Sequence, residues 1–302
     1  MLPKFPEFKK LELSDQQEIE KIFLKYEPYS DFDFASLWSW DVDQKIRISN
    51  INGNLVAILY DHFTGQPFYS FLGDKEVAKT IKQIFAFSQI TENHLPILRA
   101  VPEVSLRGID FNKFLIEIDL NNCDYVYSTA DISTYDGPKY SHKRKLYNRF
   151  TRNNPDRSIE ILDITKTEIV HKIIELSNCW LQNKGTEDEG LNLKKELKAI
   201  ERFLSAGFND TLCIGLFVKD KMIGYQLCTL LPNKYSICHF GKIDTSYHYA
   251  FEYMMSKSCE LLLERGVNFL NTEEDLGLPQ LRFSKDSYRP TAILRKYTIK
   301  EL

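Results

Sequence analysis

Glycine is scarce in this 302-residue sequence: there are 13 glycines, and no two of them lie closer than five residues apart. That spacing excludes the G-x-G-x-x-G loop of dinucleotide-binding proteins, and no G-x-x-x-x-G-K-S/T loop occurs. A G-x-S-x-G elbow and an H-E-x-x-H helix are also absent. Nicotinamide-dependent, P-loop, serine-hydrolase and zinc-peptidase chemistry therefore have no motif to support them.

Closely spaced cysteine pairs are missing as well. The six cysteines are Cys123, Cys179, Cys213, Cys228, Cys238 and Cys259. None forms the C-x-x-C pair that zinc ribbons and dithiol redox sites use, so we expect no metal site and mostly buried, reduced thiols. Cys228 and Cys238 fall on strands that we expect to pair, but small core residues are the favoured interpretation.

Long hydrophobic runs are absent too. Apolar runs such as residues 55–60 and 213–218 are only six or seven residues long, whereas a membrane-spanning helix needs about 20. Residues 1–6 contain no continuous apolar region of the kind that a secretory signal has. We therefore expect a cytoplasmic location.

A strong charge imbalance is likewise lacking, because 39 Lys and Arg stand against 42 Asp and Glu, a formal charge of −3. This balance excludes a wholly basic nucleic-acid coat, so any nucleic-acid site must be local. The composition of 43% hydrophobic and 27% charged residues is that of an ordinary globular protein. At roughly 150 residues per domain, the length predicts two domains.

The same order of elements is predicted in both halves. Hydrophobic periodicity predicts helices over residues 14–26, 34–40, 75–87, 166–183, 193–205 and 246–265, with short helices near 103 and from 279. Alternating or short apolar runs predict strands over 45–50, 54–61, 67–72, 96–100, 114–120, 212–219, 222–231, 234–240, 268–271 and 291–298. We predict a mixed α+β fold with two domains of one plan, residues 1–136 and residues 137–302.

This plan resembles that of the GNAT superfamily of acyltransferases, in which the helix after the third hairpin strand presents its N-terminus to the pyrophosphate of an acyl donor. The corresponding helix is expected to begin at Ser246, which makes Ser246 a candidate cofactor contact. The Arg/Gln-x-x-Gly-x-Gly/Ala loop that holds coenzyme A in most GNAT enzymes is missing before it, and residues 241–247 read GKIDTSY. The missing loop therefore makes acetyl-CoA a less favoured acyl donor.

The densest basic segment, residues 139–152, holds six Lys or Arg and no acidic residue. A helix there places Tyr140, Lys143, Arg144 and Tyr147 on one face. Two cations beside two aromatic rings suit RNA or a phosphorylated ligand. The alternative is a solvated helix that merely connects the two halves.

A second group of candidate residues surrounds the end of the strand over 268–271. Three carboxylates follow it, and Glu274 or Asp275 could assist removal of a proton from an attacking group. The helix from residue 279 places Arg282, Lys285 and Tyr288 on one face, where cations could hold a phosphate or a developing oxyanion. The alternative is structural: the acids stabilise the helix dipole, and Arg282 pairs with Asp286.

His239 lies in the alternating strand that ends near Lys242. A histidine on a strand can act as a general base, but it is more often a hydrogen-bonded core residue. We keep it as a catalytic candidate beside the carboxylates.

These segments resemble a known family. Residues 137–150, GPKYSHKRKLYNRF, are similar to the pattern G-K-K-Y-x-x-K-R-N-x-x-N-R-F of stand-alone bacterial proteins related to the C-terminal domain of phosphatidylglycerol lysyltransferase. Residues 239–242, 273–277 and 281–290 match the family as well, with residues 29–30 and 37–40 near the N-terminus. The resemblance spans nearly the whole length.

The resemblance implies a tandem GNAT-fold, Fem-like aminoacyltransferase with its acyl-transfer site in the C-terminal half. Lys139, Lys143, Arg144 and Asn148 then become candidate contacts to phosphate or RNA, and Arg282 and Lys285 candidate substrate contacts. Aminoacyl-tRNA would be the donor, and a phospholipid head group or another amine or hydroxyl would be the acceptor, with peripheral membrane contact. An acyl-CoA donor and a non-catalytic module that binds RNA or anionic head groups stay open as alternatives.

Overall fold

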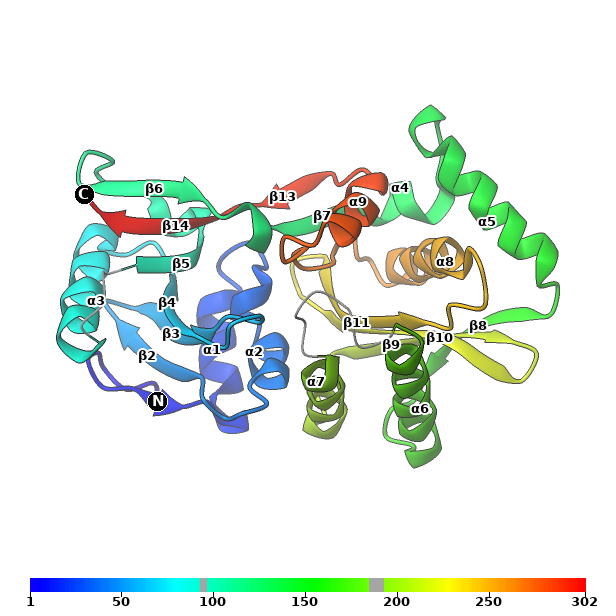
Figure 1. The fold of residues 1–302 in the computed structure, drawn as a ribbon, viewed down its shortest axis with the longest axis horizontal. Coiled ribbons are helices and arrows are strands. Elements are labelled where there is room, and N and C mark those ends of the chain that lie inside the picture. Colours follow the sequence, from blue (N-terminus) through cyan, green and yellow to red (C-terminus); the bar gives the residue numbers. More distant parts are fainter. Residues whose placement is uncertain (93–96, 185–192) are drawn as a thin grey trace. The chain divides into compact units, whose positions relative to one another are not determined.

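The computed structural model describes residues 1–92, 97–184 and 193–302. It is a mixed α/β fold with two seven-stranded sheets (Figure 1). The chain divides into two compact units. Unit 1 comprises Met1–Asp124, Glu274–Pro279 and Ile293–Leu302, and unit 2 comprises Tyr125–Glu273 and Gln280–Ala292.

Unit 1 is built on the sheet with strand order β1-β2-β3-β4-β5-β14-β6. Its strands are β1 (Lys9–Lys10), β2 (Arg47–Ile51), β3 (Asn54–Tyr60), β4 (Pro67–Leu72), β5 (Ile97–Pro102), β6 (Phe114–Ile118) and β14 (Lys296–Glu301). Its helices are α1 (Gln16–Phe23), α2 (Phe34–Trp40) and α3 (Val77–Glu92), with the 3-10 turns η1 (Leu13–Asp15), η2 (Ser30–Phe32), η3 (Glu103–Leu106) and η4 (Leu120–Asn122).

Unit 2 is built on the sheet with strand order β13-β7-β12-β11-β10-β9-β8. Its strands are β7 (Asp124–Ser128), β8 (Arg157–Leu162), β9 (Thr211–Val218), β10 (Lys221–Leu230), β11 (Tyr235–Ile243), β12 (Phe269–Asn271) and β13 (Ala292–Leu294). Its helices are α4 (Thr129–Thr134), η5 (Pro138–Tyr140), α5 (Ser141–Asn153), α6 (Thr167–Lys184), α7 (Leu193–Ala206), α8 (Ala250–Glu264) and α9 (Pro279–Ser287).

The predicted hairpin between β2 and β3 is confirmed, because Asn52 and Gly53 both have positive φ, 54° and 86°, as a tight hairpin turn requires. The predicted bounds of α2 are also confirmed: Asp33 caps the helix by accepting a hydrogen bond from the Ser36 N–H. β1, β7 and β8 were not among the predicted strands. The strand predicted over 96–100 begins at Pro96, which lies outside the described residues.

The observed division of the chain differs from a single boundary at residues 136 and 137. β14, from the end of the chain, lies between β5 and β6 in the sheet of unit 1. β7, which comes before that boundary, lies beside β12 in the sheet of unit 2. Each unit therefore completes its sheet with a strand from the other half of the sequence.

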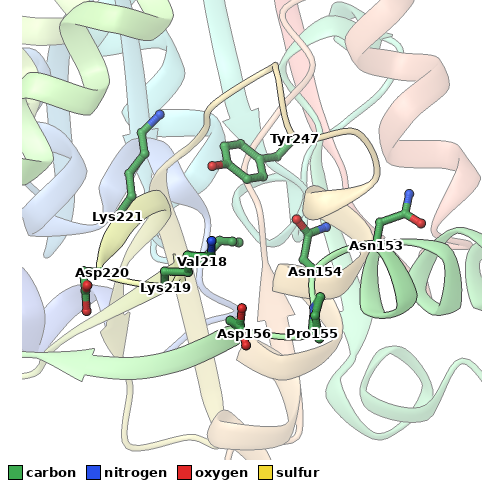
Figure 2. A pocket seen from close by; sticks show the side chains of 9 residues that line it. All are labelled: Asn153, Asn154, Pro155, Asp156, Val218, Lys219, Asp220, Lys221 and Tyr247. Atoms are coloured by element: carbon green, nitrogen blue, oxygen red, sulfur yellow. The ribbon is translucent and has the colours of Figure 1, made fainter.

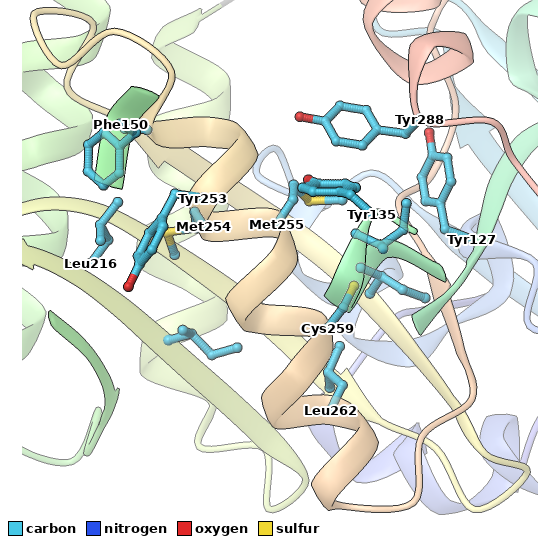
Figure 3. Packing of buried hydrophobic residues seen from close by; sticks show 14 of the residues in the cluster. Tyr127, Tyr135, Phe150, Leu216, Tyr253, Met254, Met255, Cys259, Leu262 and Tyr288 are labelled. Atoms are coloured by element: carbon cyan, nitrogen blue, oxygen red, sulfur yellow. The ribbon is translucent and has the colours of Figure 1, made fainter. Parts of the chain in front are cut away.

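Each unit has its own hydrophobic core. In unit 1, α3 packs Ile81, Ile84 and Phe85 onto the sheet. In unit 2, Met254, Met255, Cys259 and Leu262 follow the length of α8, and Tyr127, Tyr135 and Tyr288 lie close together beside it (Figure 3). The apolar stripe of α8 repeats every three to four residues, which is the period that buries one side of a helix.

Candidate functional site

Strands β11 and β12 pair over only a short length. They run parallel through Tyr235↔Phe269, Ser236↔Leu270 and Ile237↔Asn271. β12 ends at Asn271, so residues 238–243 of β11 extend beyond it on that side. Side chains at such a strand end can converge without interrupting the sheet, and sites in open α/β sheets are commonly found there.

His239 is the extra residue of a β-bulge. Cys228 pairs with Cys238 and Leu227 pairs with Phe240, which leaves the histidine unmatched on β11. Bulges re-aim side chains and are common next to active sites. The imidazole packs on Phe203 with 5.3 Å between ring centroids.

Both ring nitrogens of His239 lie within hydrogen-bonding distance of polar side chains. Nε2 is 2.9 Å from Thr229 Oγ1, and Nδ1 is 3.1 Å from Glu273 Oε1. The imidazole is 1% exposed, whereas the Glu273 side chain is 14% exposed. The histidine therefore positions the carboxylate, and the carboxylate is the member of the pair that reaches solvent.

The backbone around Glu273 is held from several sides. Its φ is 63°, a left-handed value that costs energy for a residue other than glycine. Its N–H donates to Asn271 Oδ1 at 2.7 Å, and its carbonyl accepts from the Tyr125 N–H at 3.1 Å. These contacts fix the carboxylate at the end of β12.

Lys285 supports the same segment from α9. Its ammonium donates to the carbonyl oxygen of Thr272 and, at 3.2 Å, to that of Glu273. It also lies 5.6 Å from the centroid of the Tyr125 ring. The structure thus brings Lys285 to the backbone that carries Glu273, and its contact with a substrate stays a prediction.

Glu274 and Asp275 have other surroundings, both within unit 1. Glu274 Oε2 is 3.3 Å from Ser30 Oγ. Asp275 is fully buried and accepts a hydrogen bond from the Gly277 N–H at 2.7 Å, a local turn contact. The residue that meets His239 is Glu273, which our site assignments omitted. The sequence places Glu273 among the three carboxylates after the strand and in the family-like stretch 273–277, but it does not single out this one of the three.

Arg282 lies on α9 and Tyr288 directly follows the helix, and the two differ in exposure. Arg282 is partly buried on α9. Tyr288 is buried, and its carbonyl accepts a hydrogen bond from the Tyr140 hydroxyl at 3.2 Å. The Lys143 ammonium lies 3.5 Å from the centroid of its ring. Tyr288 is thus a core contact of α5 and is not an open ligand-binding ring.

The predicted ligand face of α5 is its buried face, and this corrects the sequence-based expectation. Lys143 is buried beside Glu252 at 3.3 Å, and burial lowers the pKa of its ammonium, with Glu252 partly opposing that effect. Tyr147 stacks on Tyr253 with 5.1 Å between centroids. Arg144 donates to the carbonyl oxygens of two residues before the helix, Tyr135 and Gly137. Burial of the aromatic rings decides the orientation of the helix.

Lys139 and Asn148 are exposed. Lys139 forms an ion pair with Asp131 at 2.7 Å. These two residues are accessible to a ligand, unlike Lys143.

The prediction that a helix begins at Ser246 is wrong, because α8 begins at Ala250. The Asp244 carboxylate accepts hydrogen bonds from the Ser246 hydroxyl at 2.6 Å and from its N–H at 3.1 Å. Tyr249 then has a left-handed φ of 67°. The aspartate turn and the left-handed residue keep residues 244–249 out of the helix.

A buried group of charges lies in unit 1. The Lys296 ammonium, fully buried, contacts Asp124 at 2.6 Å and also pairs with Asp31. Burial, together with Glu274 and Asp124, raises the pKa of the Asp31 carboxyl to about 7, although Lys296 opposes the shift. Ser30 donates its N–H and its hydroxyl to Asp124.

The residues that the structure describes contain neither a membrane-spanning helix nor a cluster of metal ligands. Over residues 1–92, 97–184 and 193–302, no helix has the length and the apolar composition needed to cross a membrane. In the same ranges, no group of three or more His, Cys, Asp or Glu side chains could hold a metal ion.

Comparison with known proteins gives a family. The model of the family described as phosphatidylglycerol lysyltransferase, C-terminal, matches residues 25–300. A curated relative, an uncharacterized protein of Mycoplasmoides gallisepticum, is 24% identical over 212 residues, which cover 67% of this chain and 66% of that protein. This chain therefore spans about two thirds of the length of that relative.

Three solved structures share the fold. A protein of unknown function from Bacteroides thetaiotaomicron is 23% identical and has a TM-score of 0.83, with full coverage of both chains. The C-terminal domain of a lysylphosphatidylglycerol synthetase homologue from Agrobacterium fabrum is 11% identical, with 96% and 92% coverage and a TM-score of 0.66. L-PGS from Bacillus licheniformis is 13% identical, with 100% and 94% coverage and a TM-score of 0.65.

Proposed function

The chain belongs to the phosphatidylglycerol lysyltransferase C-terminal family, and on that premise we propose that it is an aminoacyltransferase. Its donor would be aminoacyl-tRNA, and its acceptor a phospholipid head group or another hydroxyl or amine. The observation that carries the proposal is the Glu273 carboxylate, held by a buried histidine where β12 ends and β11 continues beyond it.

The arrangement of unit 2 supports an acyl-transfer site of the GNAT type. Three antiparallel strands, β9 to β11, lead into the long helix α8, and the parallel strand β12 follows. Unit 1 repeats this order with β2 to β4, α3 and β5. We therefore regard the chain as two tandem GNAT-like units, with the reaction in unit 2.

The proposed chemistry requires one proton acceptor. The Glu273 carboxylate takes the proton from the acceptor hydroxyl or amine, whose oxygen or nitrogen then bonds to the carbonyl carbon of the donor ester. The bond between that carbon and the ribose oxygen breaks, and the proton passes to the ribose oxygen. His239 keeps the carboxylate oriented, and Lys285 holds the backbone that carries it.

An acyl-CoA donor is the alternative. It would need free N–H groups before α8 for its pyrophosphate. The N–H groups of Ser246 and Tyr247 already donate to Asp244, which favours aminoacyl-tRNA. The assay below includes both donors.

The test measures transfer of a radiolabelled aminoacyl group from a mixture of charged tRNAs, and in parallel of a radiolabelled acetyl group from acetyl-CoA. The acceptor is lipid vesicles or a small hydroxyl compound. We expect Glu273→Gln to lower the rate at least 100-fold, because the amide cannot accept the proton. Glu160→Gln on β8, an exposed glutamate of the same unit, is the control and should leave the rate unchanged.

Equal rates for wild type and Glu273→Gln would overturn the assignment of Glu273. Transfer from acetyl-CoA but not from charged tRNA would show that the donor is an acyl-CoA and not aminoacyl-tRNA. Absence of transfer from both would favour a non-catalytic binding module.

A further inference from the structure

The solvent-exposed face of α5 is a stripe of cations. Lys145, Arg149 and Arg152 are all exposed and are spaced by four and three residues, so they lie along one side of the helix. The helix has buried Lys143 and Phe150 on its other side. We call Lys145, Arg149 and Arg152 the α5 stripe.

The stripe leads to a pocket of about 710 Å³ in unit 2. The pocket is lined by residues 153–156 after α5, by the β9–β10 turn at 218–221, and by Tyr247, which lies between these two segments (Figure 2). Asn153 is the last residue of α5 and directly follows Arg152. The Arg149 guanidinium lies 5.2 Å from the Tyr249 ring, two residues from Tyr247.

The side chains of the pocket suit an uncharged, planar group with polar edges. Lys219 and Lys221 are balanced by Asp156 and Asp220 among the lining residues, and Lys221 is also paired with Asp244 at 2.7 Å. The amides of Asn153 and Asn154 supply donors and acceptors of hydrogen bonds, and Tyr247 supplies a ring for stacking. These groups fit a nucleobase and its ribose, whereas the net positive stripe fits phosphates.

We infer that this face of unit 2 binds RNA, with the phosphates on the α5 stripe and one unpaired nucleoside in the pocket beside Tyr247. The inference rests on the proposed function for the identity of the donor, aminoacyl-tRNA. The pocket also lies within reach of the proposed catalytic site. Asp244, next to the pocket, follows His239 by five residues, which is roughly 16 Å of extended polypeptide. A few unpaired nucleotides of RNA cover that length.

The α5 stripe is tested by direct binding of fluorescently labelled, uncharged tRNA, without turnover. We expect the Lys145→Ala, Arg149→Ala, Arg152→Ala triple variant to raise the Kd at least tenfold. The logarithm of the association constant falls with the logarithm of the salt concentration, and the variant should make this negative slope shallower by about 2. The control removes three exposed lysines elsewhere in unit 2, through Lys166→Ala, Lys194→Ala and Lys198→Ala. It should bind like the wild type.

The pocket is tested with two RNA hairpins, one blunt and one with a four-nucleotide unpaired 3′ end. We expect wild type to prefer the unpaired end at least fivefold, Tyr247→Ala to lose that preference, and Tyr247→Phe to keep it, because the ring is retained. The triple variant should bind both hairpins weakly. These variants need circular dichroism spectra like that of the wild type.

An equal loss of tRNA affinity in the triple variant and in its control would overturn the inference, because the net charge of the protein, and not the position of the α5 stripe, would then explain binding. So would loss of binding to anionic lipid vesicles in the triple variant with tRNA binding unchanged, which would assign the stripe to a membrane surface. Displacement of the overhang hairpin by coenzyme A, with no preference for the unpaired end, would assign the pocket to coenzyme A. Because binding is measured without transfer, a failed transfer assay leaves this test intact.

Discussion

Three consecutive acidic residues after β12 have three different environments. Glu273 meets a buried histidine, Glu274 lies near Ser30, and Asp275 closes a turn onto the Gly277 N–H. The sequence predicts a group of carboxylates at a strand end. It could not tell which of the three faces His239, because that depends on the left-handed φ of Glu273 and on the bulge in β11.

Asp31 gives a pH-dependent prediction at the residue scale. Burial and the nearby Glu274 and Asp124 carboxylates raise its pKa to about 7, so the folded state holds its proton more tightly than the unfolded state does. This contribution to the free energy of unfolding is present below about pH 4 and is lost as the pH rises toward 7. Asp31→Asn has no proton to lose, so its stability relative to wild type should increase between pH 4 and pH 7.

Urea unfolding at several pH values between 4 and 8 measures this difference. Asp136→Asn is the control, since it makes the same chemical change at an exposed position. A difference between Asp31→Asn and wild type that stays constant over this range would contradict the prediction.

At the scale of elements, α5 shows why a helix predicted well can be oriented wrongly. The sequence predicted a basic amphipathic helix over residues 139–152, and α5 covers Ser141–Asn153. The face with two tyrosines was assigned to a ligand, but those rings pack against the rest of unit 2. Sequence periodicity identifies a helix face with aromatic rings, but it does not tell whether that face binds a ligand or packs into the core. Lys143 can be buried on this face because the Glu252 carboxylate, elsewhere in unit 2, pairs with its charge.

The two faces of α5 predict very unequal effects of removing a lysine on the free energy of unfolding. Lys143→Ala leaves the Glu252 carboxylate without its cation and removes the contact with the Tyr288 ring. We expect a loss of about 2–4 kcal/mol in the free energy of unfolding. Lys145→Ala, on the exposed α5 stripe, should change it by less than about 0.5 kcal/mol.

Chemical denaturation of the two variants measures both values. A loss for Lys145→Ala as large as that for Lys143→Ala would show that the assignment of buried and exposed faces is wrong.

At the scale of the whole molecule, the sequence indicated two domains of one plan but not how strands are shared. The predicted strand over 291–298 corresponds to β13 and β14, which belong to different sheets. Strands that pair across such a distance in the sequence leave no local signal. The alternation of apolar and polar residues predicts that a segment is a strand, but not which strand lies beside it. The mixed α/β class and the family, by contrast, followed from element order and local motifs.

The shared strands predict an unequal response to truncation. Removal of residues 296–302 deletes β14, which carries the buried Ile299 and Lys296 and separates β5 from β6. We expect amides of β3 to β6 to lose protection in hydrogen exchange, while β8 to β11 stay protected. Removal of the exposed Leu302 alone is the control and should change neither set. Equal loss in both units would contradict this prediction.

The position of β14 also bears on how the protein is made on the ribosome. Lys300 pairs with Glu117, 183 residues earlier in the chain, so the edges of β5 and β6 that flank β14 stay open while all of unit 2 is translated. In unit 2, the early strand β7 also waits for its neighbours, because β12 (Phe269–Asn271) and β13 (Ala292–Leu294) are synthesised after the rest of that sheet. The half that is synthesised first is therefore the half that is completed last, and a nascent chain exposes two unpaired strand edges throughout that interval.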